Sequence, residues 1–186
     1  MLSRFTSRIS MAQARNYTNW HTLFPGSGQG KAFPWLLHTL RTLRPQTVLD
    51  YGCGKGGTAR YIQQHVNLNV DCYDPGYAPY STPPQGQYEM VYTTDVMEHI
   101  EREDVDSTIQ HIQSLTTNFH AHIIDLDPAR KRLPDGRNAH VTLLSDDEWC
   151  DTFNQWSEVV HRETEAYPDK YLTQGRRRLH IVCLKR

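Results

Sequence analysis

Residues 47–57 read TVLDYGCGKGG, and this stretch decides the fold. Its first five residues, rich in β-branched, aliphatic and aromatic side chains, predict a short buried strand. Gly52, Gly54 and Gly57 follow with the spacing G-x-G-x-x-G, and a helical pattern continues over 58–65. Glycines allow a tight turn and let a ligand approach the backbone, while a helix N-terminus offers unpaired N–H groups. The stretch therefore predicts a strand, a ligand-binding loop and a helix.

Strand and helix patterns alternate on both sides of this unit. Helices are predicted over 33–43 and 105–115, and after Ser145, where Glu148 completes a capping box. Further strands are predicted at 69–73, 88–93, 120–126, 158–165 and 178–184. Such alternation is typical of a mainly parallel sheet with helices on both faces. The last two strands have no helix between them and predict an antiparallel edge hairpin. The predicted fold class is α/β, with one Rossmann-like domain.

The composition is typical of a globular protein. The chain has 186 residues, of which 38% are hydrophobic and 22% charged. No run approaches the ~20 apolar residues that cross a bilayer, so no membrane association is expected. We interpret residues 1–30 as an N-terminal arm and loop, basic and free of acidic residues, and 31–186 as the domain. A mitochondrial transit peptide is the alternative interpretation of the arm. The four cysteines form no C-x-x-C pair, which favours reduced thiols in a cytoplasmic protein.

Two carboxylates accompany the glycine loop. Asp50 stands two residues before Gly52, and a carboxylate there suits a positively charged ligand group such as an amino-acid ammonium. Asp74 ends the next predicted strand, 22 residues after Gly52, and can accept both hydroxyls of a ribose. Together these features predict a site for adenosine joined to an amino acid. A lone G-x-G-x-x-G is also found in dinucleotide enzymes, so a nicotinamide-dependent oxidoreductase remains an alternative.

Four motifs in this order resemble class I S-adenosylmethionine-dependent methyltransferases. They are VLDYGCGKGG (48–57), YDP (73–75), TDVMEH (94–99) and LPDGRNAH (133–140). The resemblance is greatest to small bacterial and phage methyltransferase-domain proteins of unassigned substrate. It implies S-adenosylmethionine as the cofactor, with contacts from Asp50, Tyr51, Gly52, Cys53, Gly54, Asp74, Pro75, Asp95 and Val96.

One segment is shorter than this family's usual fold. A helix and a strand usually separate the ribose-binding acid from the next motif, but only residues 75–88 are available here, and four of them are prolines. The acid that usually follows that strand, near the adenine amine, has no counterpart. A sheet trimmed to about six strands is therefore expected.

Two histidines are predicted to be catalytic. Methyl transfer from a sulfonium needs a general base only when the acceptor atom carries a proton. His99 lies four residues after Asp95, so on a helix both would face the same side. His140, at the end of the polar loop, is the second candidate. The alternatives are that each histidine is a structural hydrogen-bonded group, or that His99 closes the floor of the donor site.

The polar loop 127–140 is interpreted as a lid facing the substrate. Arg130 or Arg137 could clamp a phosphate or carboxylate of the acceptor there. A solvated loop is the alternative. The glycine-rich segment 26–30 is either a second lid or a linker. The basic run 176–178 is interpreted as a solvated hairpin turn that could also contact an anion.

The predicted function is methyl transfer to an O or N atom of a small-molecule acceptor. The net charge of −1 favours a small molecule over nucleic acid. The alternatives are the oxidoreductase and a relative that binds the cofactor without turnover. No metal site is predicted, because His120 and His122, even with Asp125 near, are too few ligands for zinc.

Overall fold

The computed structural model describes residues 33–169 and 172–186. The predicted N-terminal arm and the segment 26–30 lie outside the described residues. The helices are α2 (Pro34–Leu43), α3 (Gly57–Val66), α4 (Val105–Leu115) and α5 (Asp146–Asn154), with short 3-10 turns η1 (Ala78–Tyr80), η2 (Met97–His99) and η3 (Arg102–Asp104). The strands are β1 (Val48–Tyr51), β2 (Val70–Tyr73), β3 (Tyr88–Thr94), β4 (Thr116–Asp125), β5 (Glu158–Asp169) and β6 (Leu172–Leu184).

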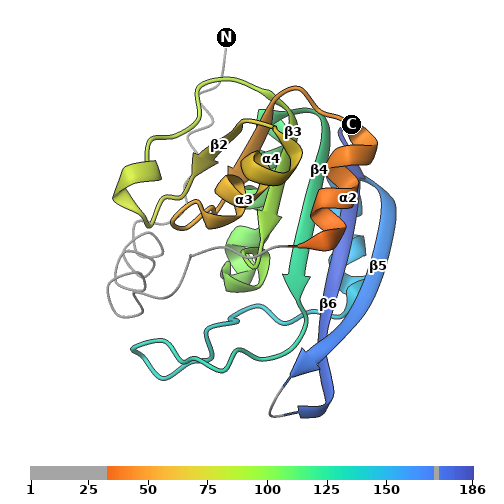
Figure 1. Cartoon of the computed structure of the whole chain (residues 1–186). Coiled ribbons are helices and arrows are strands. Elements are labelled where there is room, and N and C mark those ends of the chain that lie inside the picture. The colour runs from red at the N-terminus through yellow and green to blue at the C-terminus, as the bar shows by residue number, and fades with distance from the viewer. Residues whose placement is uncertain (1–32, 170–171) are drawn as a thin grey trace.

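The sheet has six strands in the order β2-β1-β3-β4-β6-β5 (Figure 1). The four strands β2, β1, β3 and β4 are parallel, while β6 runs antiparallel to both β4 and β5. This arrangement confirms the predicted parallel sheet with an antiparallel edge hairpin. From β1 the chain moves outward to β2 and then returns to β3 on the other side of β1. Parallel α/β sheets bind ligands at such a reversal, outside the carboxyl ends of the strands.

The segment between β2 and β3 forms only the turn η1, as its prolines predict. The Asp74 N–H donates to the Tyr80 carbonyl at 2.9 Å, which folds the turn back onto the end of β2. Strand β2 is therefore one edge of the described sheet, and the trimmed topology of six strands is confirmed.

The core forms two layers, one on each face of the sheet. Leu36, Leu40 and Ile62 of α2 and α3 cover Met90 and Tyr92 of β3. On the other face, the apolar side chains of α4 and α5 pack against the sheet; these are Val105, Ile109, Ile112, Leu115, Trp149 and Phe153. Ser145 and Glu148 form the predicted capping box. Among the described residues, no helix combines the length and apolarity that a bilayer span requires.

The C-terminal hairpin is longer than the sequence pattern predicts, and this corrects the interpretation of the basic run. Strand β6 begins at Leu172, so Arg176, Arg177 and Arg178 lie within the strand rather than in a solvated turn. Because successive residues of a strand point to opposite faces, Arg176 and Arg178 are only 7% and 8% exposed, while Arg177 is exposed. Figure 1 shows β5 and β6 extending beyond the end of β4, at the same end of the sheet as the loop after β4.

Candidate functional site

The glycine loop adopts a conformation that side chains rarely allow. Gly52, Gly54 and Gly56 have φ angles of 80°, 54° and 70°, in the left-handed region. A Cβ at Gly52 would lie 2.5 Å from Cγ2 of Val96. Glycine at this position therefore lets the loop after β1 approach the turn after β3, which places Val96 beside the loop.

Asp74 lies directly against the glycine loop. Its Oδ2 accepts the Gly54 N–H at 2.7 Å, and its Oδ1 accepts the Gly76 N–H at 2.8 Å. The Gly52 and Cys53 N–H groups both donate to the carbonyl of Tyr73, at 2.7 and 3.1 Å. A carboxylate has about four acceptor sites, so an oxygen that accepts one backbone N–H can accept a ribose hydroxyl as well. The loop and the ribose-binding candidate therefore form one site.

Asp50 is a fully buried carboxylate at this site. Its exposed fraction is 0%, and neither oxygen has a hydrogen-bond partner among the described residues. Burial raises the pKa of Asp50 well above its usual range, and Cys72 and Asp74 add to the rise. The nearby Tyr92 hydroxyl opposes the rise, although it lies outside hydrogen-bond geometry. A buried carboxylate without a partner is costly, so a cationic ligand group is the partner that this position fits.

Tyr51 and Cys53 face the core with their side chains. The Tyr51 ring packs edge-on against Tyr73 at 5.2 Å, and its hydroxyl hydrogen-bonds Nδ1 of His111 at 2.9 Å. The Cys53 thiol is buried and lies 3.6 Å from the Gly54 carbonyl. Any cofactor contact from these two residues has to come from the backbone. Pro75 follows Asp74 and is half-buried.

The turn after β3 does not have the helical geometry that the spacing of Asp95 and His99 predicts. Asp95 has φ of 54°, and η2 is a single 3-10 turn from Met97 to His99. Asp95 lies outside that turn, so the expected alignment of the two side chains on one helical face is wrong. The Asp95 N–H donates to Ile123, and its Oδ1 lies 3.7 Å from Nη2 of Arg178.

The structure brings His99 and His140 together. Their rings meet edge to face with centroids 4.8 Å apart. Nδ1 of His99 is 2.8 Å from the Ala139 carbonyl, and Nδ1 of His140 is 2.6 Å from the Asp127 carbonyl. Carbonyl oxygens only accept, so each Nδ1 carries the proton. Burial lowers the pKa of His99 to about 4 and also lowers the pKa of His140. Both imidazoles are therefore neutral at pH 7, with the ring lone pair on Nε2.

Glu98 is a site residue that the spacing argument missed, although it stands in the quoted TDVMEH motif. It is fully buried. Its Oε1 accepts the Asp125 N–H at 3.1 Å, while Oε2 has no hydrogen-bond partner among the described residues. Burial raises the pKa of Glu98 well above its usual range, and the carboxylates of Asp95 and Asp125 raise it further. Only the folded chain reveals this burial.

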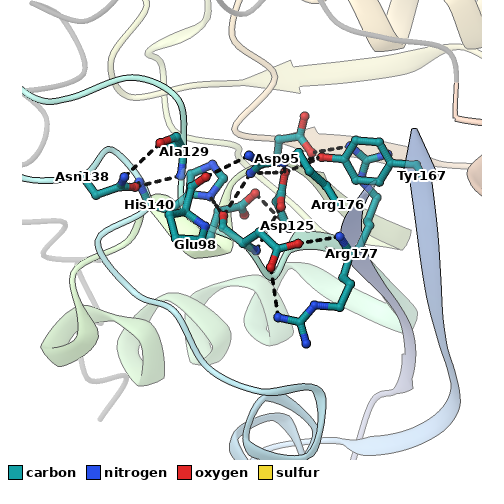
Figure 2. A network of polar contacts seen from close by, with 12 residues as sticks. Asp95, Glu98, Asp125, Ala129, Asn138, His140, Tyr167, Arg176 and Arg177 are labelled. Atoms are coloured by element: carbon teal, nitrogen blue, oxygen red, sulfur yellow. Dashed lines mark hydrogen bonds and ion pairs between the residues drawn. The ribbon is translucent and has the colours of Figure 1, made fainter. Parts of the chain in front are cut away.

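A buried ion pair joins the hairpin to the end of β4 (Figure 2). Nη2 of Arg176 lies 3.0 Å from Oδ2 of Asp125, and both side chains are less than a tenth exposed. The Tyr167 hydroxyl donates to the same Oδ2 at 2.7 Å, and Arg176 also donates to the carbonyls of Asp127 and Pro128. Sequence analysis missed this pair because it placed Arg176 in a solvated turn.

The predicted substrate arginines lie on the loop after β4. Arg137 is half-exposed and already paired, with Glu101 at 3.0 Å and Asp135 at 2.7 Å. Asn138 hydrogen-bonds both backbone groups of Ala129, which closes the loop on itself. A substrate anion would have to displace the carboxylate partners of Arg137, so the clamp role of Arg137 and of the exposed Arg130 stays a prediction.

His120 and His122 form a closed hydrogen-bond chain inside the sheet. His122 Nδ1 contacts Thr93 Oγ1 at 2.9 Å, His122 Nε2 contacts His120 Nδ1 at 2.7 Å, and His120 Nε2 contacts Ser157 Oγ at 2.6 Å. All four ring nitrogens are therefore used. Cys183 offers a third metal-ligating atom nearby, whereas Asp125 pairs with Arg176 instead.

The chain is similar to known methyltransferases in sequence pattern and in fold. A family model described as a methyltransferase domain matches residues 27–164. No curated protein matches the chain. A solved structure of 1,6-didemethyltoxoflavin-N1-methyltransferase from Burkholderia thailandensis is similar, with 13% identity and a TM-score of 0.65 over 100% of this chain and 92% of that one.

Two further solved structures share the fold. Magnesium protoporphyrin IX methyltransferase from Synechocystis PCC 6803 has 13% identity and a TM-score of 0.62, with 100% of both chains covered. The TehB protein of Haemophilus influenzae has 16% identity and a TM-score of 0.58, and the comparison covers 88% of this chain and 66% of that one. Identities this low demonstrate a common fold.

Proposed function

The chain belongs to the class I methyltransferase family, and on this premise we propose that it transfers the methyl group of S-adenosylmethionine to an oxygen or nitrogen atom of a small-molecule acceptor. S-adenosylmethionine is the methyl donor of the family, and solved structures of the fold hold it or its demethylated product.

The contact between the glycine loop and Asp74 carries this proposal. Their 2.7 Å hydrogen bond joins the two features that recognise the two halves of the donor, at the carboxyl ends of adjacent parallel strands. Asp74 is assigned to the ribose hydroxyls, and the buried, unpartnered Asp50 to the ammonium of the methionine half. Gly52 and Gly54 supply backbone that a ligand can approach closely. Val96 packs against Gly52 from the turn after β3.

The transfer itself is an in-line displacement at a carbon that the sulfonium has already activated. The chain's main contribution is to hold donor and acceptor in line and to exclude water, effects worth up to roughly 7–11 kcal/mol. On the acceptor side, His99 and His140 are the proposed catalytic residues. Each is neutral with a lone pair on Nε2, so either can take the proton of a hydroxyl or amine acceptor, a contribution of typically ~10²–10⁴-fold.

A small acceptor is favoured by the net charge of −1 and by the similar toxoflavin-type enzyme, whose structure contains its small-molecule substrate. The oxidoreductase alternative is disfavoured, because a dinucleotide fold needs two mononucleotide-binding halves. In the described part of this chain, only β1, β2, β3 and β4 run parallel, and the next strand is antiparallel.

Calorimetry with S-adenosylhomocysteine tests the donor site. We expect wild-type binding and a loss of roughly 10- to 100-fold in affinity for Asp74→Ala, because charge-assisted hydrogen bonds are worth about 1.5–3 kcal/mol. Asp71→Ala is the matched control, since Asp71 is an exposed carboxylate on β2, the strand that leads into Asp74. Unchanged affinity in Asp74→Ala would contradict the assignment. Binding of NADH in place of S-adenosylhomocysteine would favour the oxidoreductase, and binding without transfer of labelled methyl would favour the non-catalytic relative.

A further inference from the structure

Three metal-ligating side chains converge beside the proposed donor site. A carboxylate oxygen of Glu98 and one ring nitrogen each of His99 and His140 lie within 4.8 Å of one another. Glu98 and His99 come from η2, and His140 comes from the loop after β4. Figure 2 shows Glu98 and His140 side by side, with Asp95 and Asp125 close to them. We call Glu98, His99 and His140 the edge cluster.

The hydrogen bonds of His99 and His140 fix their rings in the way that is typical of metal-binding histidines. A metal-binding imidazole typically donates its other ring N–H to a carbonyl or carboxylate, which fixes the tautomer and aims the lone pair. Nδ1 of His99 donates to Ala139 and Nδ1 of His140 donates to Asp127, so the lone pair of each ring is on Nε2.

The charges around the cluster favour a cation. Oε2 of Glu98 is buried with no hydrogen-bond partner among the described residues, and the carboxylates of Asp95 and Asp125 act on the same group. Arg176 and Arg178 face the cluster from β6, and they pair with Asp125 and Asp95 rather than with Glu98. The Glu98 carboxylate thus has no basic partner in the described structure.

We propose that the edge cluster binds one divalent transition-metal ion, with Glu98, His99 and His140 as its protein ligands. Two imidazoles and one carboxylate are a donor set typical of Zn²⁺ and of other first-row ions, whereas Mg²⁺ prefers oxygen ligands alone. Tetrahedral ligand bonds of about 2.0–2.2 Å place donor atoms roughly 3.3–3.6 Å apart. Small side-chain movements reach that spacing from the present separations, which are at most 4.8 Å.

A second cluster, inside the sheet, provides the contrast. It consists of His120, His122 and Cys183, and we call it the interior cluster. Its potential ligand atoms also lie within 4.8 Å of one another. Every ring nitrogen there already has a protein partner in the chain from Thr93 to Ser157. An ion would have to break those bonds in a fully buried position, so the same residue types predict no metal there.

A bound ion would act on the acceptor. Three protein ligands leave coordination positions open, and an ion lowers the pKa of a hydroxyl that binds it. The imidazoles would then hold the ion in place of taking the proton, and the ion-bound hydroxyl of the acceptor would release its proton to water. This role rests on the proposed methyl transfer and favours hydroxyl-bearing acceptors. Metal binding itself does not depend on the proposed function.

Calorimetric titration of the chelator-treated full chain with Zn²⁺ tests the site, and Co²⁺ absorbance reports its coordination. We expect one Zn²⁺ per chain. Binding should weaken roughly 10- to 100-fold or more in Glu98→Gln and His140→Asn. These variants preserve the existing bonds: the glutamine carbonyl can accept the Asp125 N–H, and the asparagine amide can replace Nδ1–H towards Asp127. His99→Asn is the second histidine variant, in which the asparagine amide can replace Nδ1–H towards Ala139. Thermal unfolding shows whether each variant is folded.

Two controls remove other histidines. His122→Asn disrupts the interior cluster, and His161→Asn removes an exposed imidazole; both should keep one Zn²⁺ per chain. Full binding in folded Glu98→Gln and His140→Asn would overturn the proposal. Loss of binding confined to His122→Asn, or no saturable binding in wild type, would also overturn it. S-adenosylhomocysteine affinity, measured in parallel, separates failure of the metal site from failure of the proposed function.

Discussion

The interior cluster and the edge cluster use similar side chains in opposite ways. In the interior, the rings of His120 and His122 are hydrogen-bonded to each other, and each is also hydrogen-bonded to a hydroxyl group, of Ser157 and Thr93 respectively. At the edge, His99 and His140 bond backbone carbonyls through Nδ1, and the neighbouring Glu98 has a buried oxygen with no partner among the described residues. The comparison teaches that residue type alone does not identify a site. A polar cluster that satisfies itself stabilises the fold, while one that leaves buried acceptors unsatisfied is suited to binding.

The largest expected effect concerns the ion pair beside the edge cluster. Arg176→Ala leaves the Asp125 carboxylate buried without its cation, and breaking a buried pair costs about 3–5 kcal/mol. Urea unfolding should show this loss in the free energy of unfolding. Arg177→Ala is the matched control, because the adjacent Arg177 is 62% exposed in its side chain and pairs with Asp127 at the surface. Equal losses in the two variants would mean that Arg176 does not anchor the hairpin.

A smaller effect is expected in the interior cluster. Ser157→Ala removes the partner of His120 Nε2 and leaves a buried ring nitrogen unsatisfied, at a cost of about 1–3 kcal/mol. Zn²⁺ affinity should stay at the wild-type value, because the proposed ligands of the ion belong to the edge cluster. The free energy of unfolding and the zinc titration measure the two quantities on the same sample. A stable variant with weakened zinc binding would reverse the roles of the two clusters.

The smallest effect is a pH dependence of opposite sign in the two clusters. Burial raises the folded-state pKa of Glu98, so its contribution to stability is present below about pH 4.5 and is lost as pH rises through the folded pKa. Glu98→Gln should therefore stabilise the metal-free protein at pH 7, and this gain should vanish towards pH 4. Urea unfolding across that range measures the difference between variant and wild type.

His120 should behave in the opposite way. Burial lowers its pKa from its usual 6.5 to about 4. Its contribution to stability is therefore fully present above pH 6.5 and is lost as pH falls towards 4. The stability difference between wild type and His120→Gln should shrink over that range. If the stability differences of the Glu98 and His120 variants changed with pH in the same direction, the predicted contrast between the two clusters would be wrong.

Local patterns in the sequence predict much of the fold and the donor half of the site. The strand, glycine loop and helix around residues 47–66 follow from glycine spacing and apolar periodicity, and the prolines after Asp74 explain the shortened sheet. These features depend on neighbours along the chain, where hydrophobic pattern and turn chemistry act. The lid roles of Arg130 and Arg137 and the contacts of Asp50 and Asp74 with a ligand stay predictions.

The sequence by itself therefore determined that the sheet is mainly parallel, that it has about six strands, and that a glycine loop follows β1. Short-range backbone preferences specify these features. Only the tertiary structure decided which polar groups are buried together. It placed Arg176 and Arg178 within strand β6 and buried them, and it formed a single 3-10 turn after Asp95 where helical spacing was expected. It also brought His140 from a distant loop to Glu98 and His99. Burial and strand register arise from contacts between distant segments, and those contacts set the partners and pKa values of the site.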